Sequence, residues 1–240
     1  MKYSNLIIII LNFFDYFQQK RIIKLINKKF KYPITVFDIG AHHGETIKLF
    51  IKKLNIKKIY SFEASPKNFL IMKENTKIYK KKVEIHNFGL GDKILNTYIH
   101  QTQESSSSTI NEINKDSKYF KRKLKILNIK NKNLFSYKVP IQLYTLDYFI
   151  EKNEIENIDL VKIDTEGYEF NILKGLSKHS NKIKLIYFEH HYDDMILKNY
   201  KFGDIHQILK DRNFKMIQKS KMIFRKSFEY VYENQKNKRA

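Results

Sequence analysis

One sequence feature restricts the fold of this chain more than any other. It is a short apolar strand signal that is followed directly by a glycine loop and a helix. Residues 34–39 (ITVFDI) are rich in β-branched and aromatic side chains, which are typical of a buried strand. Gly40 and Gly44 follow at once. Apolar residues then recur at the helical spacing of three and four positions: Ile47, Phe50, Ile51 and Leu54. This strand–loop–helix unit predicts an α/β fold with a mainly parallel sheet.

The same alternation continues along the chain. Further strand signals cover residues 58–62, 83–88, 158–164 and 183–189, and helix signals cover 65–79, 168–176 and 204–211. Two closing strand signals, near 214–218 and 222–232, lack a crossover helix between them, so we expect them to be antiparallel. We therefore predict a Rossmann-like sheet of about seven strands, mostly parallel, with an antiparallel C-terminal strand.

Residues 93–136 interrupt the alternation. They contain a serine run, Ser105–Ser108, and a stretch rich in Lys and Asn without a clear period. We interpret the segment as a mixed insertion in a domain that covers residues 32–240, with a helix near 115–127. We expect the serine run and the lysine-rich stretch to form a lid that selects the substrate, and a mobile loop is the alternative.

The first 31 residues form a separate element. The apolar run at residues 6–11 is too short for a bilayer span, which takes about 20 apolar residues, and no small-residue cleavage site follows it. We predict one amphipathic helix over residues 4–29. Two alternatives stay open: a cap packed on the following domain, or peripheral contact with an anionic membrane surface. We expect a cytoplasmic protein, with attachment to the inner membrane face as the alternative.

Composition excludes several classes of site. The chain has no Cys, which excludes a disulfide framework, thiolate metal sites and a cysteine nucleophile. Its formal net charge of +21 would suit nucleic acid, anionic lipid or an acidic glycan. However, only five of the 46 basic residues are Arg, the side chain that makes bidentate contacts with bases and phosphates, and they are scattered. We interpret the Lys excess as a solvated surface and expect no nucleic-acid partner.

Polar residues at the ends of the first two predicted strands point to a nucleoside. Open α/β sheets bind ligands at the carboxyl ends of their strands. There Asp38 precedes Gly40 and Gly44, whose G-x-x-x-G spacing differs from the dinucleotide loop and disfavours a pyrophosphate. Glu63, at the tip of the second strand, is placed to accept both hydroxyls of a ribose. Together these residues predict a nucleoside-containing cofactor.

The turn after the third predicted strand offers a further ligand contact. Gly89 and Asp92 lie in the sequence Phe-Gly-Leu-Gly-Asp, which could flank an adenine by apolar packing and hydrogen bonds. An ordinary turn is the alternative.

The last two candidate strand ends carry acids and imidazoles. Asp164 ends the strand signal at 158–164, and Glu189, His190 and His191 end the next one. Glu166 and Glu169 have a structural explanation as favourable charges at a helix N-terminus. We expect Asp164 and Glu189 to converge in the ligand crevice.

Five motifs in this order resemble the FkbM-type methyltransferases that use S-adenosylmethionine. They are VFDIGAHHGET (36–46), FEASP (62–66), GLGD (89–92), YTLD (144–147) and VKIDTEGYE (161–169). The resemblance covers roughly residues 33–220 and implies the seven-stranded methyltransferase variant of the Rossmann fold. It also implies S-adenosylmethionine as the cofactor and a hydroxyl of a sugar, glycan or natural product as the methyl acceptor.

The resemblance also assigns the cofactor residues. It places Asp38, Gly40 and Gly44 around the methionine end of the cofactor and Glu63 on the ribose. His42 stands where relatives commonly have Asn, beside the same ligand.

Methyl transfer to a hydroxyl mainly requires alignment of donor and acceptor and a base for the proton. Our hypothesis is that Asp164, Glu189 and one of His190 or His191 line the acceptor side, and that a His or Glu189 takes the proton. No residue set is assigned to a resident metal. A Mg²⁺ ion held by Asp164 and Glu189 is the second alternative, because oxygen ligands suit it.

The sequence argues against two other kinds of methyl transfer. The absence of Cys excludes C5-pyrimidine methylation through a thiolate adduct. The three prolines are isolated, so the Asn/Asp-Pro-Pro-aromatic loop of many amino-methylating enzymes is absent. Two alternatives remain beside O-methylation of a small or glycan acceptor: an RNA 2′-O-methyltransferase, and a catalytically inactive module that keeps the fold.

Overall fold

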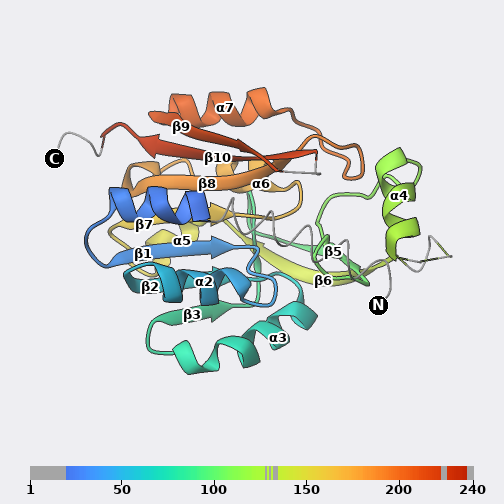
Figure 1. The fold of residues 1–240 in the computed structure, drawn as a ribbon, viewed down its shortest axis with the longest axis horizontal. Coiled ribbons are helices and arrows are strands. Elements are labelled where there is room, and N and C mark those ends of the chain that lie inside the picture. The colour runs from blue at the N-terminus through green and yellow to red at the C-terminus, as the bar shows by residue number, and fades with distance from the viewer. Residues whose placement is uncertain (1–19, 128, 130, 132–134, 223–225, 237–240) are drawn as a thin grey trace.

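The computed structural model describes residues 20–127, 129, 131, 135–222 and 226–236, and its centre is a seven-stranded sheet in the order β3-β2-β1-β7-β8-β10-β9 (Figure 1). The strands are β1 (Ile34–Ile39), β2 (Ile56–Phe62), β3 (Val83–His86), β7 (Ile158–Ile163), β8 (Ile183–His191), β9 (Phe214–Lys221) and β10 (Ser227–Asn234). Neighbouring strands are parallel except β10, which is antiparallel to both β8 and β9. This topology confirms the predicted fold class.

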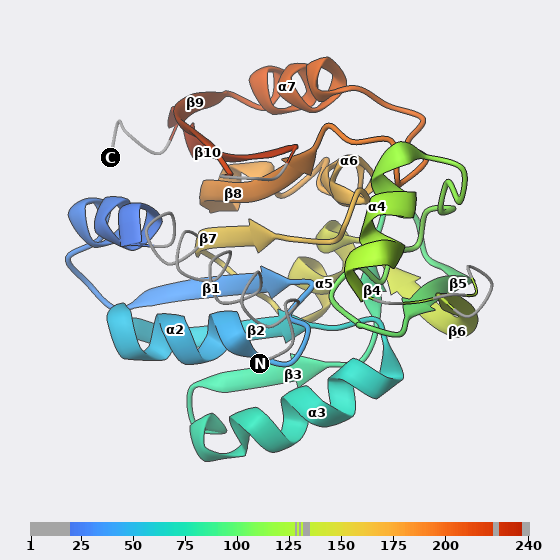
Figure 2. The ribbon, with the colours of Figure 1, turned by 45° about the vertical axis from the view of Figure 1, so that its right-hand side comes forward.

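Helices cover both faces of the sheet (Figures 1 and 2). The helical segment 20–29, α2 (Glu45–Lys53) and α3 (Pro66–Thr76) cover one side, which we call the α2 face; α5 (Leu146–Lys152), α6 (Glu169–Lys174) and α7 (Phe202–Asp211) cover the other, the α7 face. Because side chains alternate along a strand, Val36 and Leu160 pack under the α2 face, while Phe37 and Val161 pack under the α7 face. Every central strand therefore contributes to two cores.

The helix N-termini follow their sequence signals. Ser65 caps α3 by accepting a hydrogen bond from the Asn68 N–H (3.2 Å), and Pro66 occupies the first turn, as predicted. Helix α5, which the sequence analysis missed, is capped by Thr145 in the same way. The carboxylate of Asp147 then accepts backbone N–H bonds from residues 177–179 at 2.7–3.0 Å. The aspartate of the YTLD motif thus ties α5 to the loop after α6.

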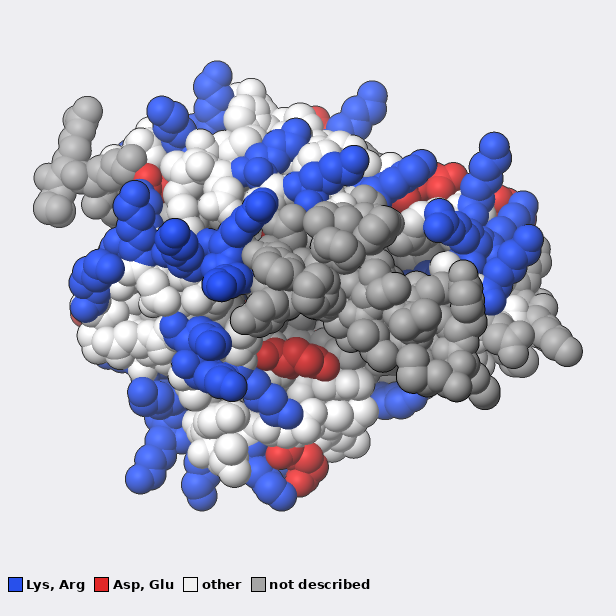
Figure 3. All heavy atoms as spheres, in the orientation of Figure 1, with Lys and Arg blue, Asp and Glu red and all other residues white. Residues whose placement is uncertain are grey.

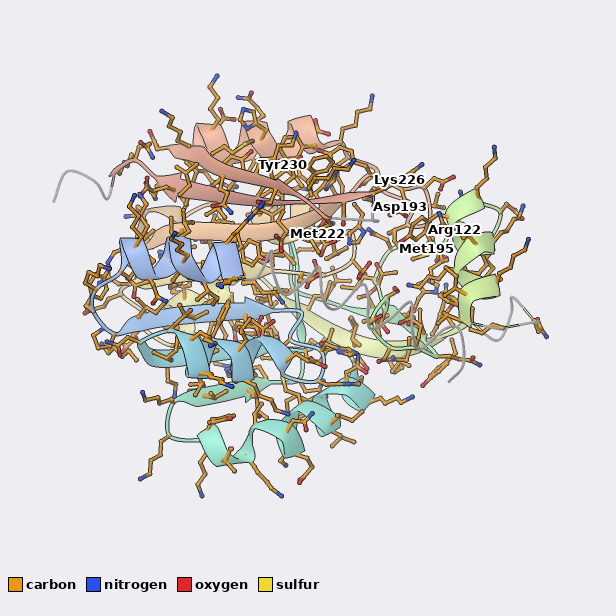
Figure 4. The ribbon with its side chains drawn as sticks, in the orientation of Figure 1. Arg122, Asp193, Met195, Met222, Lys226 and Tyr230 are labelled. Atoms are coloured by element: carbon orange, nitrogen blue, oxygen red, sulfur yellow. The ribbon has the colours of Figure 1, made fainter. Side chains whose placement is uncertain are left out.

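The region predicted as an insertion holds structure that periodicity did not reveal. β5 (Leu95–Thr102) pairs with β6 (Ser136–Tyr144), which pairs with β4 (Gly89–Leu90), in a separate three-stranded sheet. The end of β5 buries polar side chains, including Gln101, while Tyr98 is 57% exposed, so no apolar alternation marks the strand. The predicted helix near 115–127 is confirmed as α4 (Lys118–Leu127). Phe120 of α4 belongs to a buried apolar cluster with Phe135 and Met195. Figure 4 labels Met195 beside α4.

The described part of the predicted N-terminal helix packs on the sheet. In the segment 20–29, Ile22, Ile23 and Ile26 are buried in the core of the α2 face, and the basic side chains beside them are exposed. Residues 4–19 of the predicted helix lie outside the described residues. No helix in the part of the chain that the structure describes has the length and apolarity to cross a membrane.

Gly40 allows β1 and β7 to approach closely where both strands end. Its backbone is left-handed (φ +80°), and an added Cβ would lie 1.9 Å from the carbonyl oxygen of Asp164. On either side, the Gly40 N–H donates to the carbonyl of Phe62 (2.9 Å) and the Asp164 N–H donates to that of Ile39 (2.9 Å). Only glycine meets both the backbone conformation and the contact.

We expect Gly40→Ala to lower the free energy of unfolding by at least about 2 kcal/mol, because the variant combines backbone strain with a clash against main chain. Gly203→Ala in α7 is the matched control, since nothing lies within 4 Å of its added Cβ. It should leave stability unchanged or raise it by about 0.4–1 kcal/mol. Denaturant titration measures both, and equal stability of the two variants would contradict the close contact.

Candidate functional site

Two neighbouring pockets open at the carboxyl ends of the parallel strands, the edge that faces the small sheet and α4 in Figure 2. The glycine pocket, of about 70 Å³, follows β1 and β2; its lining includes Gly40, His42, Glu63, Gly89 and Ser105. The glutamate pocket, of about 160 Å³, lies on the α2 face; its lining includes Lys162, Tyr187, Glu189 and Glu229. Asp164 lines both pockets, so it marks their junction.

Glu63 lies at the end of β2 with its carboxylate fixed by main chain. One oxygen accepts the N–H of His42 (2.8 Å) and the other accepts the N–H of Ser65 (2.9 Å). Burial raises the pKa of Glu63 to about 7, although these two N–H groups act in the opposite direction. The side chain of Asn68 also hydrogen-bonds this carboxylate, which retains acceptor capacity for a ligand hydroxyl.

His42 connects the glycine loop to the serine run. Its Nε2 lies 2.7 Å from the hydroxyl of Ser105, and its Nδ1 lies 3.3 Å from Oε1 of Glu45. Burial lowers the pKa of His42, but the carboxylates of Glu45, Glu63 and Glu104 together outweigh this effect, so the net shift is upward. The serine run, which we expected over the acceptor, borders the glycine pocket through Ser105 and Ser106.

A buried lysine occupies the middle of the sheet beside the glutamate pocket. Nζ of Lys162 lies 3.3 Å from Oδ1 of Asp38 and 3.4 Å from Oδ2 of Asp164. Burial alone would lower the pKa of Lys162, but the two carboxylates raise it, so the ammonium group stays charged. Asp38 is 0% exposed and points toward this lysine on the α2 face, so it does not line the glycine pocket.

Two other predicted cofactor residues also lie away from the glycine pocket. Gly44 caps α2 with φ +87°, where an added Cβ would lie 2.8 Å from Cγ2 of Thr76. Asp92 forms an ion pair with Lys174 of α6 (3.0 Å). Neither residue lines a described pocket, whereas Gly40, His42, Glu63 and Gly89 do.

The two adjacent histidines of β8 lie on opposite faces of the sheet. His191 points the same way as Glu189, and its Nε2 lies 3.4 Å from Oε1 of Glu189 and 3.6 Å from Oε2 of Glu166. These carboxylates outweigh the effect of burial and raise the pKa of His191 to about 10. At neutral pH His191 is therefore an imidazolium, which holds a proton and cannot accept one.

His190 belongs to an aromatic cluster on the α7 face. Its ring centroid lies 5.8 Å from those of Tyr200 and Phe202, and burial lowers its pKa to about 4. Phe202 stacks in turn on Tyr230, which Figure 4 labels beneath α7. Of the two histidines, only His191 is near the predicted acceptor side.

Sequence reasoning missed three charged residues of the site. Lys162 had a usable signal, since a lysine inside an apolar strand needs a carboxylate partner. Glu166 was explained as a favourable charge at a helix N-terminus, but its backbone turns into the left-handed region (φ +50°) and burial raises its pKa to about 7. Glu229 comes from the antiparallel strand β10, directly opposite Glu189, and no motif marks that pairing.

A resident metal finds little support in this arrangement. In the part of the chain that is described, the one group of three donors within 4.8 Å is His42, His43 and Glu45. Its two imidazole rings are stacked with centroids 3.7 Å apart, so their in-plane lone pairs do not converge on one ion. The group does not include Asp164 or Glu189, the residues of the alternative Mg²⁺ site.

We expect Lys162→Met to lower the free energy of unfolding by about 3–5 kcal/mol, because Asp38 would be left as a buried charge without its partner. Adding Asp38→Asn should recover part of this loss. Lys184→Met is the control on the neighbouring strand, where the partly exposed pair with Asp159 (2.9 Å) should contribute about 1 kcal/mol or less. Denaturant titration of these three variants and of Asp38→Asn alone measures the coupling, and additive effects at residues 38 and 162 would contradict it.

Comparison with solved structures agrees with this fold. An FkbM methyltransferase from Methylobacillus flagellatus KT matches 83% of this chain and 44% of its own length, with a TM-score of 0.54 and 15% identity. A putative tRNA (m1A22) methyltransferase from Streptococcus pneumoniae, in complex with S-adenosyl-L-methionine, matches 89% and 72% with a TM-score of 0.49 and 13% identity. At 15% identity the likeness to the first structure shows the fold alone, and the chain spans less than half of that structure.

Sequence comparison gives the family. No curated protein matches this chain. The family model of the methyltransferase FkbM domain, however, matches residues 38–216, about three quarters of the sequence. The chain therefore belongs to the FkbM methyltransferase family.

Proposed function

We propose that this chain is an S-adenosylmethionine-dependent O-methyltransferase that acts on a hydroxyl of a sugar, glycan or natural-product acceptor. The observation that carries the proposal is the junction of two different pockets at Asp164. One pocket has the glycine turn and the strand-end acid suited to a nucleoside, and the other has buried carboxylates suited to a hydroxyl donor. A cofactor in the first pocket and an acceptor in the second would therefore be adjacent at Asp164.

The residues that line the glycine pocket suit the nucleoside end of S-adenosylmethionine. Glu63 offers acceptor capacity to the ribose hydroxyls, and Phe88 and Leu90 give apolar surface for a base. The pocket of about 70 Å³ is well below the roughly 300–1,000 Å³ of small-molecule sites. Binding therefore requires the serine run to move, and the His42–Ser105 hydrogen bond is the contact that it would break.

Glu189 is the group best placed to take the hydroxyl proton. When bound, the cofactor supplies a methyl group carried by its sulfonium sulfur. The acceptor alcohol attacks this methyl group efficiently only if the alcohol loses its proton at the same time. His191 is already protonated and His190 faces α7, so neither serves as the base. Oε1 of Glu189 is buried and has no hydrogen-bond partner among the described residues. The His191 imidazolium holds this carboxylate in place, and Asp164 faces it across the same pocket.

The charges that line the glutamate pocket favour a small or glycan acceptor over RNA, although the net charge of +21 alone would suit nucleic acid. Figure 3 shows Lys and Arg side chains spread over the visible face of the molecule, without a single basic track. The glutamate pocket itself is lined by more carboxylates than cations, which would repel a phosphate backbone. These observations support a small or glycan acceptor.

Methyl transfer itself is the direct test. The purified chain is incubated with methyl-labelled S-adenosylmethionine and separate pools of glycans, lipids, small metabolites and RNA. We expect label in a glycan or small-metabolite pool, as a base-stable ether. Label in RNA would instead support the 2′-O-methyltransferase, and cofactor binding by calorimetry without label in any pool would refute the proposed acceptor classes.

We expect Glu63→Gln to weaken S-adenosylmethionine binding about 10- to 150-fold, because hydrogen bonds to a charged group contribute about 1.5–3 kcal/mol. In the native chain affinity should rise between pH 6 and 8, since the pKa of Glu63 is about 7 and its ionised form is the better acceptor. The variant should lack this rise. Glu74→Gln, exposed on α3, is the control, and calorimetry at several pH values measures all three proteins.

We expect Glu189→Gln to lower kcat at least about 100-fold, the usual contribution of a general base. Its S-adenosylmethionine Kd should change by less than about twofold, since Glu189 does not line the glycine pocket. Glu156→Gln, exposed before β7, is the control. Single-turnover methyl transfer measures the rate, and calorimetry measures the affinity for S-adenosylmethionine. An equal loss of rate and affinity would show that Glu189 is not the base.

A further inference from the structure

Helix α3 and the short 3₁₀ helix that follows it (Lys77–Tyr79) expose apolar side chains on their outer side. Ile78 is 74% exposed and Leu70 is 63% exposed, the two highest values among the large apolar side chains of the described residues. Ile71 is also exposed, and it lies two helical turns before Ile78 and therefore on the same side. Single exposed apolar residues are ordinary, but these three lie within residues 70–78 and form a patch, which we call the α3 patch.

The other side of α3 is already used for packing. Asn68, Met72 and Thr76 are spaced four residues apart and are the buried residues of the helix. Met72 belongs to the core of the α2 face. Figures 1 and 2 show α3 on the outside of the molecule, along the β3 edge of the sheet. The fold therefore holds the α3 patch outward on a rigid helix.

Exposed lysines surround the α3 patch. Six of them lie between residues 67 and 82: Lys67, Lys73, Lys77, Lys80, Lys81 and Lys82. Glu74 is the only acid in this stretch, and it pairs with Lys77 at 3.0 Å. The other five lysines have no ion pair with any residue that the structure describes. Figure 3 shows basic side chains projecting from the lower edge of the molecule, where α3 lies in Figure 1.

Aliphatic side chains among lysines match the chemistry of an anionic membrane surface. Leu and Ile side chains can enter the boundary of the acyl chains, and Lys side chains extend along it and place their ammonium groups among the headgroups. A nucleic acid would contact the lysines but leave Leu70 and Ile78 in water. A second copy of the chain on this patch would bring two groups of lysines together, which repel each other.

We infer that the chain binds the surface of anionic bilayers through the α3 patch. Leu70 and Ile78 enter the apolar boundary, and the turn at Lys80–Lys82 contacts the lipid phosphates. This surface is separate from the first 31 residues, for which the sequence left membrane contact open. The inference is also independent of methyl transfer, because binding is measured without cofactor or acceptor.

Vesicle binding by matched isoleucine variants tests the apolar contact. The full chain is titrated with vesicles of phosphatidylcholine, with and without phosphatidylglycerol, and bound protein is measured by sedimentation. We expect binding to the anionic vesicles that weakens as salt is added. Ile78→Ser should weaken this binding about tenfold or more, because its side chain leaves the apolar boundary. Ile94→Ser, exposed directly before β5, is the control and should change binding by less than about twofold.

Paired lysine variants test the electrostatic contact. Lys80→Gln with Lys81→Gln should weaken binding about 30-fold, since each Lys near an anionic surface contributes about a factor of five. Lys178→Gln with Lys210→Gln removes the same charge on the other side of the sheet and should weaken binding less than about threefold. Thermal unfolding shows whether each variant is folded.

Four results would overturn the inference. They are no binding to anionic vesicles, an equal effect of Ile78→Ser and Ile94→Ser, an equal effect of the two lysine pairs, and tighter binding to RNA than to vesicles. An equal effect of the isoleucine variants would place the attachment elsewhere in the chain. Sedimentation without vesicles adds a further check, because a dimer that Ile78→Ser dissociates would show that a second copy covers the patch.

Discussion

Lys162 can be buried in the middle of this sheet only because carboxylates lie on both sides of it. Its ammonium group joins Asp38 of β1 to Asp164 at the end of β7, the two strands between which the strand order reverses. Gly40 brings the same two strand ends into main-chain contact. Asp164 is therefore held at a fixed point, and both pockets are built around that point. The positions of Glu63 on one side and Glu189 on the other follow from the register of the strands that carry them.

Alternation along single strands decides which residues share this site. Tyr187, Glu189 and His191 point toward the α2 face, and His190, between them in sequence, packs under α7. The two adjacent histidines thus differ in charge: His191 is protonated among carboxylates, and His190 is neutral among aromatic rings. The pairing of β8 with β10 adds Glu229 to the same row. Successive residues of β8 therefore alternate between a charged layer on the α2 face and an apolar layer on the α7 face.

Sequence patterns predicted the elements that are periodic and the residues that end strands. The seven-stranded sheet, the capped start of α3 and the convergence of Asp164 with Glu189 all follow from local signals. The small sheet did not, because β5 buries Gln101 and exposes Tyr98, which removes the apolar alternation. Asp38 was assigned to a cofactor because its strand end is polar, but its carboxylate pairs with Lys162 of another strand. Such pairings across strands are set by register, which single-strand periodicity does not contain.

The two pockets also differ in where their residues lie along the chain. Every described residue that lines the glycine pocket falls within residues 38–216, the part that the FkbM family shares. The glutamate pocket draws Ile22, Ile23, Met222 and Glu229 from outside that range. Under the proposed function, the cofactor half of the site lies within the segment that the family model matches, whereas the acceptor half, which also holds Glu189, takes part of its lining from the flanking sequence. Changes in the two flanking segments would then alter the walls of the acceptor pocket and leave the lining of the cofactor pocket unchanged.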